Sequence, residues 1–87
     1  MKFKARIEVS LKKDLTDPES ETVRKSLIDL DFGISEVRIS KYYEIVIEAE
    51  TKKDAETSAK LMCTRLLANP VKDEYSVEVE DAVSSKS

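Results

Sequence analysis

Hydrophobic and polar residues alternate strictly at the start of the chain. This alternation predicts a half-buried β-strand over residues 1–11, with one apolar face made by Phe3, Ala5, Ile7, Val9 and Leu11. The same pattern predicts two strands over 34–40 and 42–50, joined by a tight turn near Ser40 and Lys41. A fourth strand is expected around residues 75–80, where Tyr75, Val77 and Val79 alternate with polar residues.

Apolar residues at helical spacing predict two helices between these strands. The first should begin at Asp17-Pro18, because Asp17 can cap a helix and Pro18 suits the first helical position. Gly33 is expected to end it in the left-handed conformation. The second should follow the capping residue Thr51 and stop at Asn69-Pro70. The predicted apolar stripes are Val23, Leu27, Ile28 and Leu30 on the first helix, and Ala55, Ala59, Met62, Cys63 and Leu66 on the second.

The element order is strand, helix, strand, strand, helix, strand, with one apolar face on each element. Two layers satisfy all of these faces, so the order favours a ferredoxin-like α+β sandwich. We expect an antiparallel four-stranded sheet with both helices on one face, the first and third strands central and the second and fourth at the edges. The 87 residues are enough for one domain. We expect that domain over residues 1–83, followed by a frayed tail over 84–87.

The surface pattern is that of an ordinary soluble protein. Charged residues make up 38% of the chain, both signs are interspersed, and the net charge is -3. No apolar run approaches the ~20 residues that a membrane span needs. The first residues read as a strand where a signal peptide would be charged and then apolar, so we expect a cytoplasmic protein with no nucleic-acid or membrane partner.

The chain lacks residue types that several kinds of catalytic and binding site require. The chain contains no histidine, which removes imidazole-dependent triads and histidine-ligated metal sites. Its single glycine excludes glycine-rich phosphate loops. Cys63 lies on a predicted apolar stripe, which favours a buried and unreactive thiol. We therefore predict no catalytic residue, no cofactor-binding residue and no metal ligand in this chain.

The predicted helix-free face of the sheet carries many carboxylates. A carboxylate-only cation site there is conceivable, but Lys4, Arg6 and Arg38 are expected on the same face and favour a mixed, partner-facing surface. Tyr42 and Val46 also project there and would be sensible interface anchors. Scattered exposed apolar residues are equally common on surfaces without a partner.

Two other functions fit this topology. An RNA-recognition module would need aromatic residues on its central strands and a basic field, and the acidic chain offers only Tyr42 near its third strand. A small-molecule-sensing regulatory domain could form a site from backbone groups at a dimer interface. No feature of the sequence favours that second alternative.

Several strings, in order and spacing, resemble the PurS-type small subunit of phosphoribosylformylglycinamidine synthase over almost the whole chain. They are Val9-Ser10-Leu11-Lys12, Asp17-Pro18, Val37-Arg38-Ile39-Ser40-Lys41-Tyr42, Met62-Cys63, and Leu66-Leu67-Ala68-Asn69-Pro70-Val71 followed by Tyr75. The chain departs from the family pattern at Ser20 and Ser40, where glycine is usual. A positive φ at Ser40 would therefore cost energy that glycine avoids.

The resemblance implies a non-catalytic assembly subunit of an ATP- and glutamine-dependent ligase in purine biosynthesis. It implies a homodimer or tetramer that bridges a glutaminase subunit and a synthetase subunit and helps ammonia pass between them, with ATP and magnesium used by the synthetase subunit. Within this frame we predict a partner interface made by Arg38, Lys41, Tyr42, Val46, Asn69 and Tyr75. A helix stop at Asn69-Pro70 and a core position for Tyr75 are the competing structural interpretations.

Overall fold

The structure, a computed structural model, describes residues 1–82. The predicted tail over 84–87 lies outside the described residues. In chain order the elements are β1 (Lys2–Leu11), α1 (Pro18–Asp29), β2 (Lys41–Glu48), α2 (Lys52–Met62), the π-helical turn η1 (Cys63–Leu67) and β3 (Asp73–Asp81). The predicted α+β class, the presence of two helices and the antiparallel sheet are confirmed.

The sheet has three strands within residues 1–82, in the order β2-β1-β3, and both pairings are antiparallel. Ile7 lies opposite Tyr43 on one side and Val77 on the other, so the first strand is central as predicted. The predicted strand over 34–40 is wrong, and β2 is consequently an edge strand.

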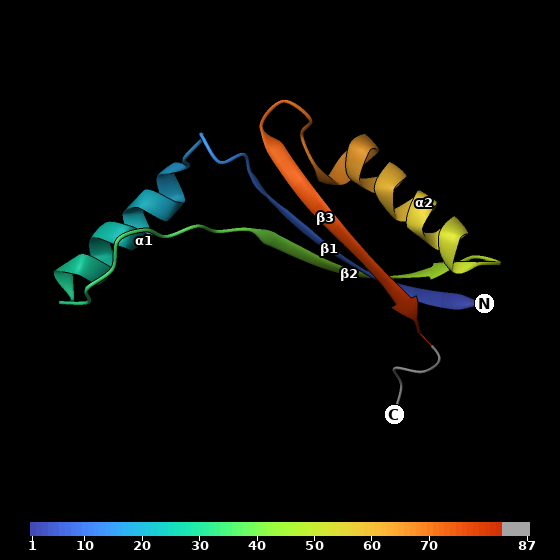
Figure 1. Cartoon of the computed structure of the whole chain (residues 1–87). Helices are drawn as coiled ribbons and strands as arrows, with labels where there is room; N and C mark the ends of the chain where they lie inside the picture. Colours follow the sequence, from blue (N-terminus) through green and yellow to red (C-terminus); the bar gives the residue numbers. More distant parts are fainter. Residues whose placement is uncertain (83–87) are drawn as a thin grey trace.

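Residues 34–40 run back beside α1 and lead into β2 without pairing as a strand (Figure 1). Arg38, expected on the open sheet face, instead donates from its Nη2 to the Leu11 carbonyl oxygen at 2.7 Å. The turn expected near Ser40 is absent for the same reason, since no strand precedes it. Ser40 has no positive φ, and its hydroxyl donates to the Glu8 carboxylate at 2.9 Å.

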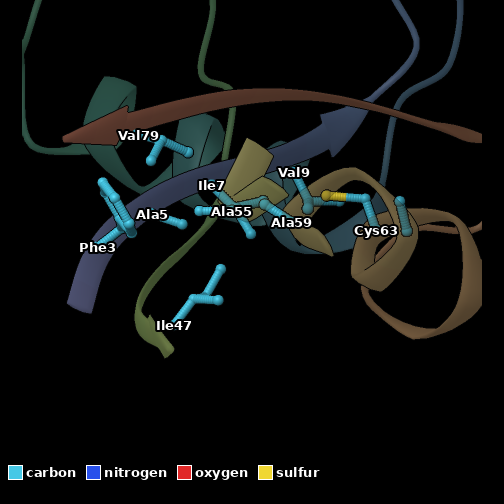
Figure 2. Close-up of a cluster of buried hydrophobic side chains, with 10 residues drawn as sticks. Phe3, Ala5, Ile7, Val9, Ile47, Ala55, Ala59, Cys63 and Val79 are labelled. Atoms are coloured by element: carbon cyan, nitrogen blue, oxygen red, sulfur yellow. The ribbon is translucent and has the colours of Figure 1, made fainter. Parts of the chain in front are cut away.

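The core lies between β1 and α2. Figure 2 shows Phe3, Ala5, Ile7 and Val9 on the inner face of β1, and Ala55, Ala59 and Cys63 facing them, with Ile47 and Val79 from the outer strands. Ala5, Ile7, Ala55, Ala59 and Cys63 have no exposed surface. The alanines on the buried stripe of α2 are fully buried where the helix packs on β1 and β3.

Helix α1 begins as predicted but ends differently. The Asp17 carboxylate accepts a hydrogen bond from the Ser20 backbone amide at 2.6 Å, and Pro18 is the first helical residue. The left-handed residue at the other end is Asp31, with φ 74°, and the prediction for Gly33 is wrong. The amides of Asp31 and Phe32 donate to the carbonyls of Ile28 and Leu27, which closes a Schellman motif before the chain reaches Gly33.

Helix α1 stands beyond the end of the sheet, whereas α2 lies along it (Figure 1). The predicted placement of both helices on one sheet face is therefore wrong. The radius of gyration is 16.6 Å, whereas a compact domain of this length would have about 12 Å. We call residues 12–40 the arm. Its apolar residues are left partly in solvent, with Leu30 69% and Phe32 56% exposed.

Helix α2 begins at its predicted cap, where the Thr51 hydroxyl accepts from the Asp54 amide at 3.1 Å. It runs into the π turn η1, in which the Ala68 amide donates to the Cys63 carbonyl at 2.9 Å. A π turn holds one more residue than an α turn, so the apolar stripe shifts by one position. Leu67 packs against the core, while Leu66, predicted to be buried, is 83% exposed.

Candidate partner interface

Cys63 is buried, and burial raises the pKa of its thiol because the thiolate would lose its hydration. No group of three or more potential metal ligands occurs among the described residues. No helix in this part of the chain has both the length and the hydrophobicity to cross a membrane.

The helix-free face of the sheet is built from the outward residues of all three strands. Arg6, in the central strand, reaches both neighbours, with its Nη2 2.8 Å from Glu80 and its Nε 3.7 Å from Glu44. The hydrogen bond between Arg6 and Glu80 stabilises both charged side chains. It lowers the pKa of Glu80 and raises the pKa of Arg6. Tyr42 and Val46 project from this face, 60% and 58% exposed.

Lys41 and Tyr75 lie on the opposite, helix-bearing face, since both are paired with the buried Val9. A groove of about 210 Å³ opens at this end of the sheet, between the base of the arm and the turn before β3. Its lining includes Lys41, Ile39, Leu67 and Lys72. Tyr75 is partly exposed, so it is not a fully buried core residue.

Arg38 belongs to the arm. It lies over the end of β1 through its bond to Leu11 and is 4.0 Å from the Glu36 carboxylate. A second groove, of about 160 Å³, lies between α1 and residues 35–39. Its lining includes Leu15, Arg24 and Arg38. Arg24 is paired with Glu21 at 2.8 Å, and this contact lowers the pKa of Glu21.

Asn69 organises the turn between η1 and β3. The side-chain oxygen of Asn69 accepts a hydrogen bond from the Val71 backbone amide at 2.9 Å. The backbone amide of Asn69 donates to the Asp73 carboxylate, also at 2.9 Å. Asn69 does not take the left-handed conformation suggested for a helix end, because Asp31 alone among the described non-glycine residues has a positive φ. The helix does stop beside Asn69-Pro70, as predicted.

The six predicted interface residues therefore do not form one surface. Tyr42 and Val46 lie on the open sheet face, Lys41 and Tyr75 on the other face, Arg38 on the arm and Asn69 in a turn. Sequence reasoning missed the most exposed large apolar residues of the described chain, Leu66 and Val71, at 83% and 80%. Both residues belong to residues 66–71, one of the strings on which the family resemblance rests. That resemblance was the signal in the sequence that could have pointed to them.

Within residues 1–82, a small α+β chain with a three-stranded sheet and a projecting arm that exposes apolar residues has the features of an assembly subunit. The family model for phosphoribosylformylglycinamidine (FGAM) synthase, PurS, matches residues 4–81. The chain belongs to the PurS family and is a subunit of that synthase, a ligase of purine biosynthesis.

Individual relatives agree in length and structure. The chain is 37% identical over 83 residues to the PurS subunit of Bacillus subtilis, covering 94% of this chain and 98% of the relative. The crystal structure of Methanocaldococcus jannaschii PurS matches with a TM-score of 0.81 at 35% identity, covering 91% and 96% of the two chains. A chain in the structure of PurLQS from Thermotoga maritima matches with a TM-score of 0.84 at 32% identity, covering 92% and 99%.

Proposed function

We propose that this chain is the bridging subunit of its synthase, joining a glutaminase subunit to an ATP- and magnesium-dependent synthetase subunit in the cytoplasm. It would contribute no reacting group. Its role would be to hold the two active sites together, so that ammonia released from glutamine reaches formylglycinamide ribonucleotide before it is protonated and diluted in solvent.

The observation that supports this proposal is the exposure of apolar residues along the arm. Apolar residues remain exposed along the whole arm, among them Leu15, Ile28, Leu30 and Phe32. A chain that folds to function alone would bury such residues, because each buried leucine or phenylalanine contributes about 1.5–3 kcal/mol. Surfaces of this kind are typical of chains completed by partners.

The first such partner, in our proposal, is a second copy. Helix α2 packs on β1 and β3, so the inner face of β2 is incompletely covered and Tyr43 and Ile45 are only half-buried. The arm of a second copy offers an amphipathic helix of suitable polarity to cover them. β2 and β3 are the outer strands of the sheet formed by residues 1–82, and strand pairing at these edges is a second route to association. A homodimer is the smallest assembly that uses these surfaces, and a tetramer would use more of them.

The homo-oligomer is tested by light scattering coupled to size exclusion. Leu30→Asp places a charge on the exposed apolar side of the arm and should shift the chain toward the monomer. Asp29→Asn, next to it in sequence, keeps the apolar surface and should leave the oligomer intact. An oligomer that survives Leu30→Asp unchanged would remove the arm from the interface.

The bridging role is tested by co-expression with the glutaminase and synthetase subunits. All three should co-migrate, and glutamine-dependent synthesis should need this chain, whereas synthesis from added ammonium should depend on it much less. Equal glutamine-dependent rates with and without the chain would refute the bridging role. Charge reversal at Arg38 and Lys41, and truncation of Tyr42, Val46, Asn69 or Tyr75, would then show which of the predicted interface residues contact a partner.

A further inference from the structure

The outer edge of β2 is the place where the expected sheet is incomplete. The sequence pattern predicts a strand over 34–40 next to β2, but within residues 1–82 the sheet ends at β2, in the order β2-β1-β3. Helix α2 packs on β1 and β3 and leaves this side of the sheet uncovered. An outer strand presents backbone N–H and C=O groups that can pair with a further strand. The edge of β2 is therefore a position at which the sheet can be extended.

The composition of β2 favours such an extension. Its eight residues, KYYEIVIE, are mostly β-branched or aromatic and include no proline or glycine. The other outer strand, β3, is DEYSVEVED and carries five carboxylates among its nine residues. Charged side chains on an outer strand are a common protection against pairing with another chain. Of the two outer strands formed by residues 1–82, β2 is thus the one suited to pairing.

The partner that fits β2 best is β2 of a second copy, paired antiparallel about a two-fold axis. Opposed side chains of an antiparallel pair lie on the same face of the sheet, and a two-fold axis perpendicular to the sheet preserves that face. One residue of β2 must therefore lie opposite the same residue of the second copy. Such an interface closes on itself, whereas pairing of β2 with β3 of another copy would continue into a filament.

Charge selects the residue that lies on the axis. With Ile45 on the axis, residues 42–48 pair, Glu44 lies opposite Val46 and Tyr42 lies opposite Glu48, so no two like charges face each other. An axis through Glu44 would set two Glu44 carboxylates opposite each other. An axis through Val46 would oppose Glu44 and Glu48. Ile45 therefore gives the longest pairing that is free of like-charge repulsion.

The same test excludes β3. An axis through Ser76 would oppose Glu74 and Glu78, an axis through Val77 would oppose Glu74 and Glu80, and an axis through Glu78 would oppose that residue to itself. Like charges directly opposite each other destabilise a strand pair. Every register that joins the middle of β3 to a second β3 is therefore unfavourable.

The register about Ile45 also joins the apolar inner faces of the two copies. Tyr43 and Ile45 are half-buried and pack against the core. Ile45 would lie against Ile45 of the second copy and Tyr43 against its Ile47, and apolar cross-strand pairs of this kind stabilise a sheet. On the open face, Tyr42 and Val46, 60% and 58% exposed, would lose part of their exposed surface. One register thus covers apolar residues on both faces.

From these observations we infer that β2 pairs antiparallel with β2 of a second copy, with Ile45 on the two-fold axis, so that two three-stranded sheets become one sheet of six strands. The inference rests on the homo-oligomer of the proposed function and adds the strand, the register and the symmetry of one interface. Both α2 helices then lie on one side of the joined sheet. The inner face on that side is the surface that the arms are proposed to cover.

Cysteine crosslinking tests the register. Full chains carrying Tyr42→Cys are mixed with full chains carrying Glu48→Cys under mild oxidation, and the mixture should form a disulfide-linked dimer because these positions lie directly opposite. Each variant alone is the matched control, since its two cysteines would be separated by six residues along the strands, about 20 Å, which a disulfide cannot bridge. Glu44→Cys chains that crosslink with one another more readily than the mixture does would overturn the register.

A charge at position 46 tests the strand. Position 46 lies opposite Lys4 within its own copy and opposite Glu44 of the second copy in the inferred register. Val46→Glu should therefore weaken the dimer and Val46→Lys should strengthen it. Because symmetry makes this contact twice, their dimer dissociation constants should differ by about tenfold or more at low salt and converge at high salt.

The two position-46 variants control for each other, since both place a charge at the same exposed site. Within a single copy Lys4 favours the reverse order, because it attracts Glu and repels Lys at position 46. An effect on folding alone would therefore make the Val46→Lys chain the weaker one. Dissociation constants that are equal, or that follow this reverse order, would overturn the pairing of β2.

The outcomes separate the inference from the function on which it rests. An oligomeric wild type whose Tyr42→Cys and Glu48→Cys variants do not crosslink in the mixture would overturn the pairing, while the arm-mediated contact and the bridging role would stand. A wild type that stays monomeric at every concentration would refute the homo-oligomer and the inference together. A crosslinked dimer from a chain that binds neither larger subunit would support the pairing and refute the bridging role.

Discussion

Truncation of the two adjacent leucines of the π turn should lower the stability of the protein by different amounts. Fully burying a leucine side chain contributes about 1.5–3 kcal/mol. Leu66 remains 83% exposed, so Leu66→Ala should lower the free energy of unfolding by no more than about 0.5 kcal/mol. Leu67 is half-buried against the core, so Leu67→Ala should cost about 1–2 kcal/mol, with a further contribution from any cavity left behind.

A regular α-helix would reverse this order. Leu66 would then continue the buried stripe, and its truncation would cost about 2–5 kcal/mol as for other core leucines. The free energies are measured by urea unfolding followed by far-ultraviolet circular dichroism, with all variants at one protein concentration because oligomerisation contributes to the apparent stability. A larger loss for Leu66→Ala than for Leu67→Ala would refute the assignment of the π turn.

Three further predictions concern the helix ends and the charged groups. Gly33→Ala should leave the stability unchanged or raise it by up to about 1 kcal/mol, as measured by thermal unfolding. The reason is that Gly33 has no positive φ and an added Cβ would meet no atom within 4 Å. A clear loss of stability would indicate that Gly33, and not Asp31, is the left-handed residue at the helix end. Thr51→Ala should cost about 1 kcal/mol in urea unfolding, since it removes the cap of α2, whereas Thr51→Ser should restore most of it; equal losses for the two variants would contradict the capping role. Hydrogen bonds lower the pKa values of Asp17, Glu21 and Glu80. The folded state therefore binds fewer protons than the unfolded state, and the stability should fall as the pH drops below about 4.5. An unchanged melting temperature between pH 6 and pH 3 would show that these contacts contribute nothing to stability.

Local signals in the sequence determined most of the elements. The alternation in residues 2–11 and the caps at Asp17 and Thr51 act over a few residues, and the structure has each of them where the pattern placed it. The buried Cys63 followed from its spacing with Ala55 and Ala59 along one helix face. The absence of histidine and the single glycine likewise limited the chemistry of the chain before any fold was known.

The tertiary structure decided how these elements combine. Residues 34–40 have a strand-like pattern, but a strand also needs a partner edge, and these residues run along α1 instead (Figure 1). The stripe of α1 identifies an apolar face without saying which surface covers it. Likewise, the sequence 63–67 suits an α turn and a π turn alike, and only packing of Leu67 against the core selects the π turn that exposes Leu66. Patterns over a few residues report local backbone preference, whereas strand pairing and burial depend on residues far apart in the chain, and in this protein on other chains as well.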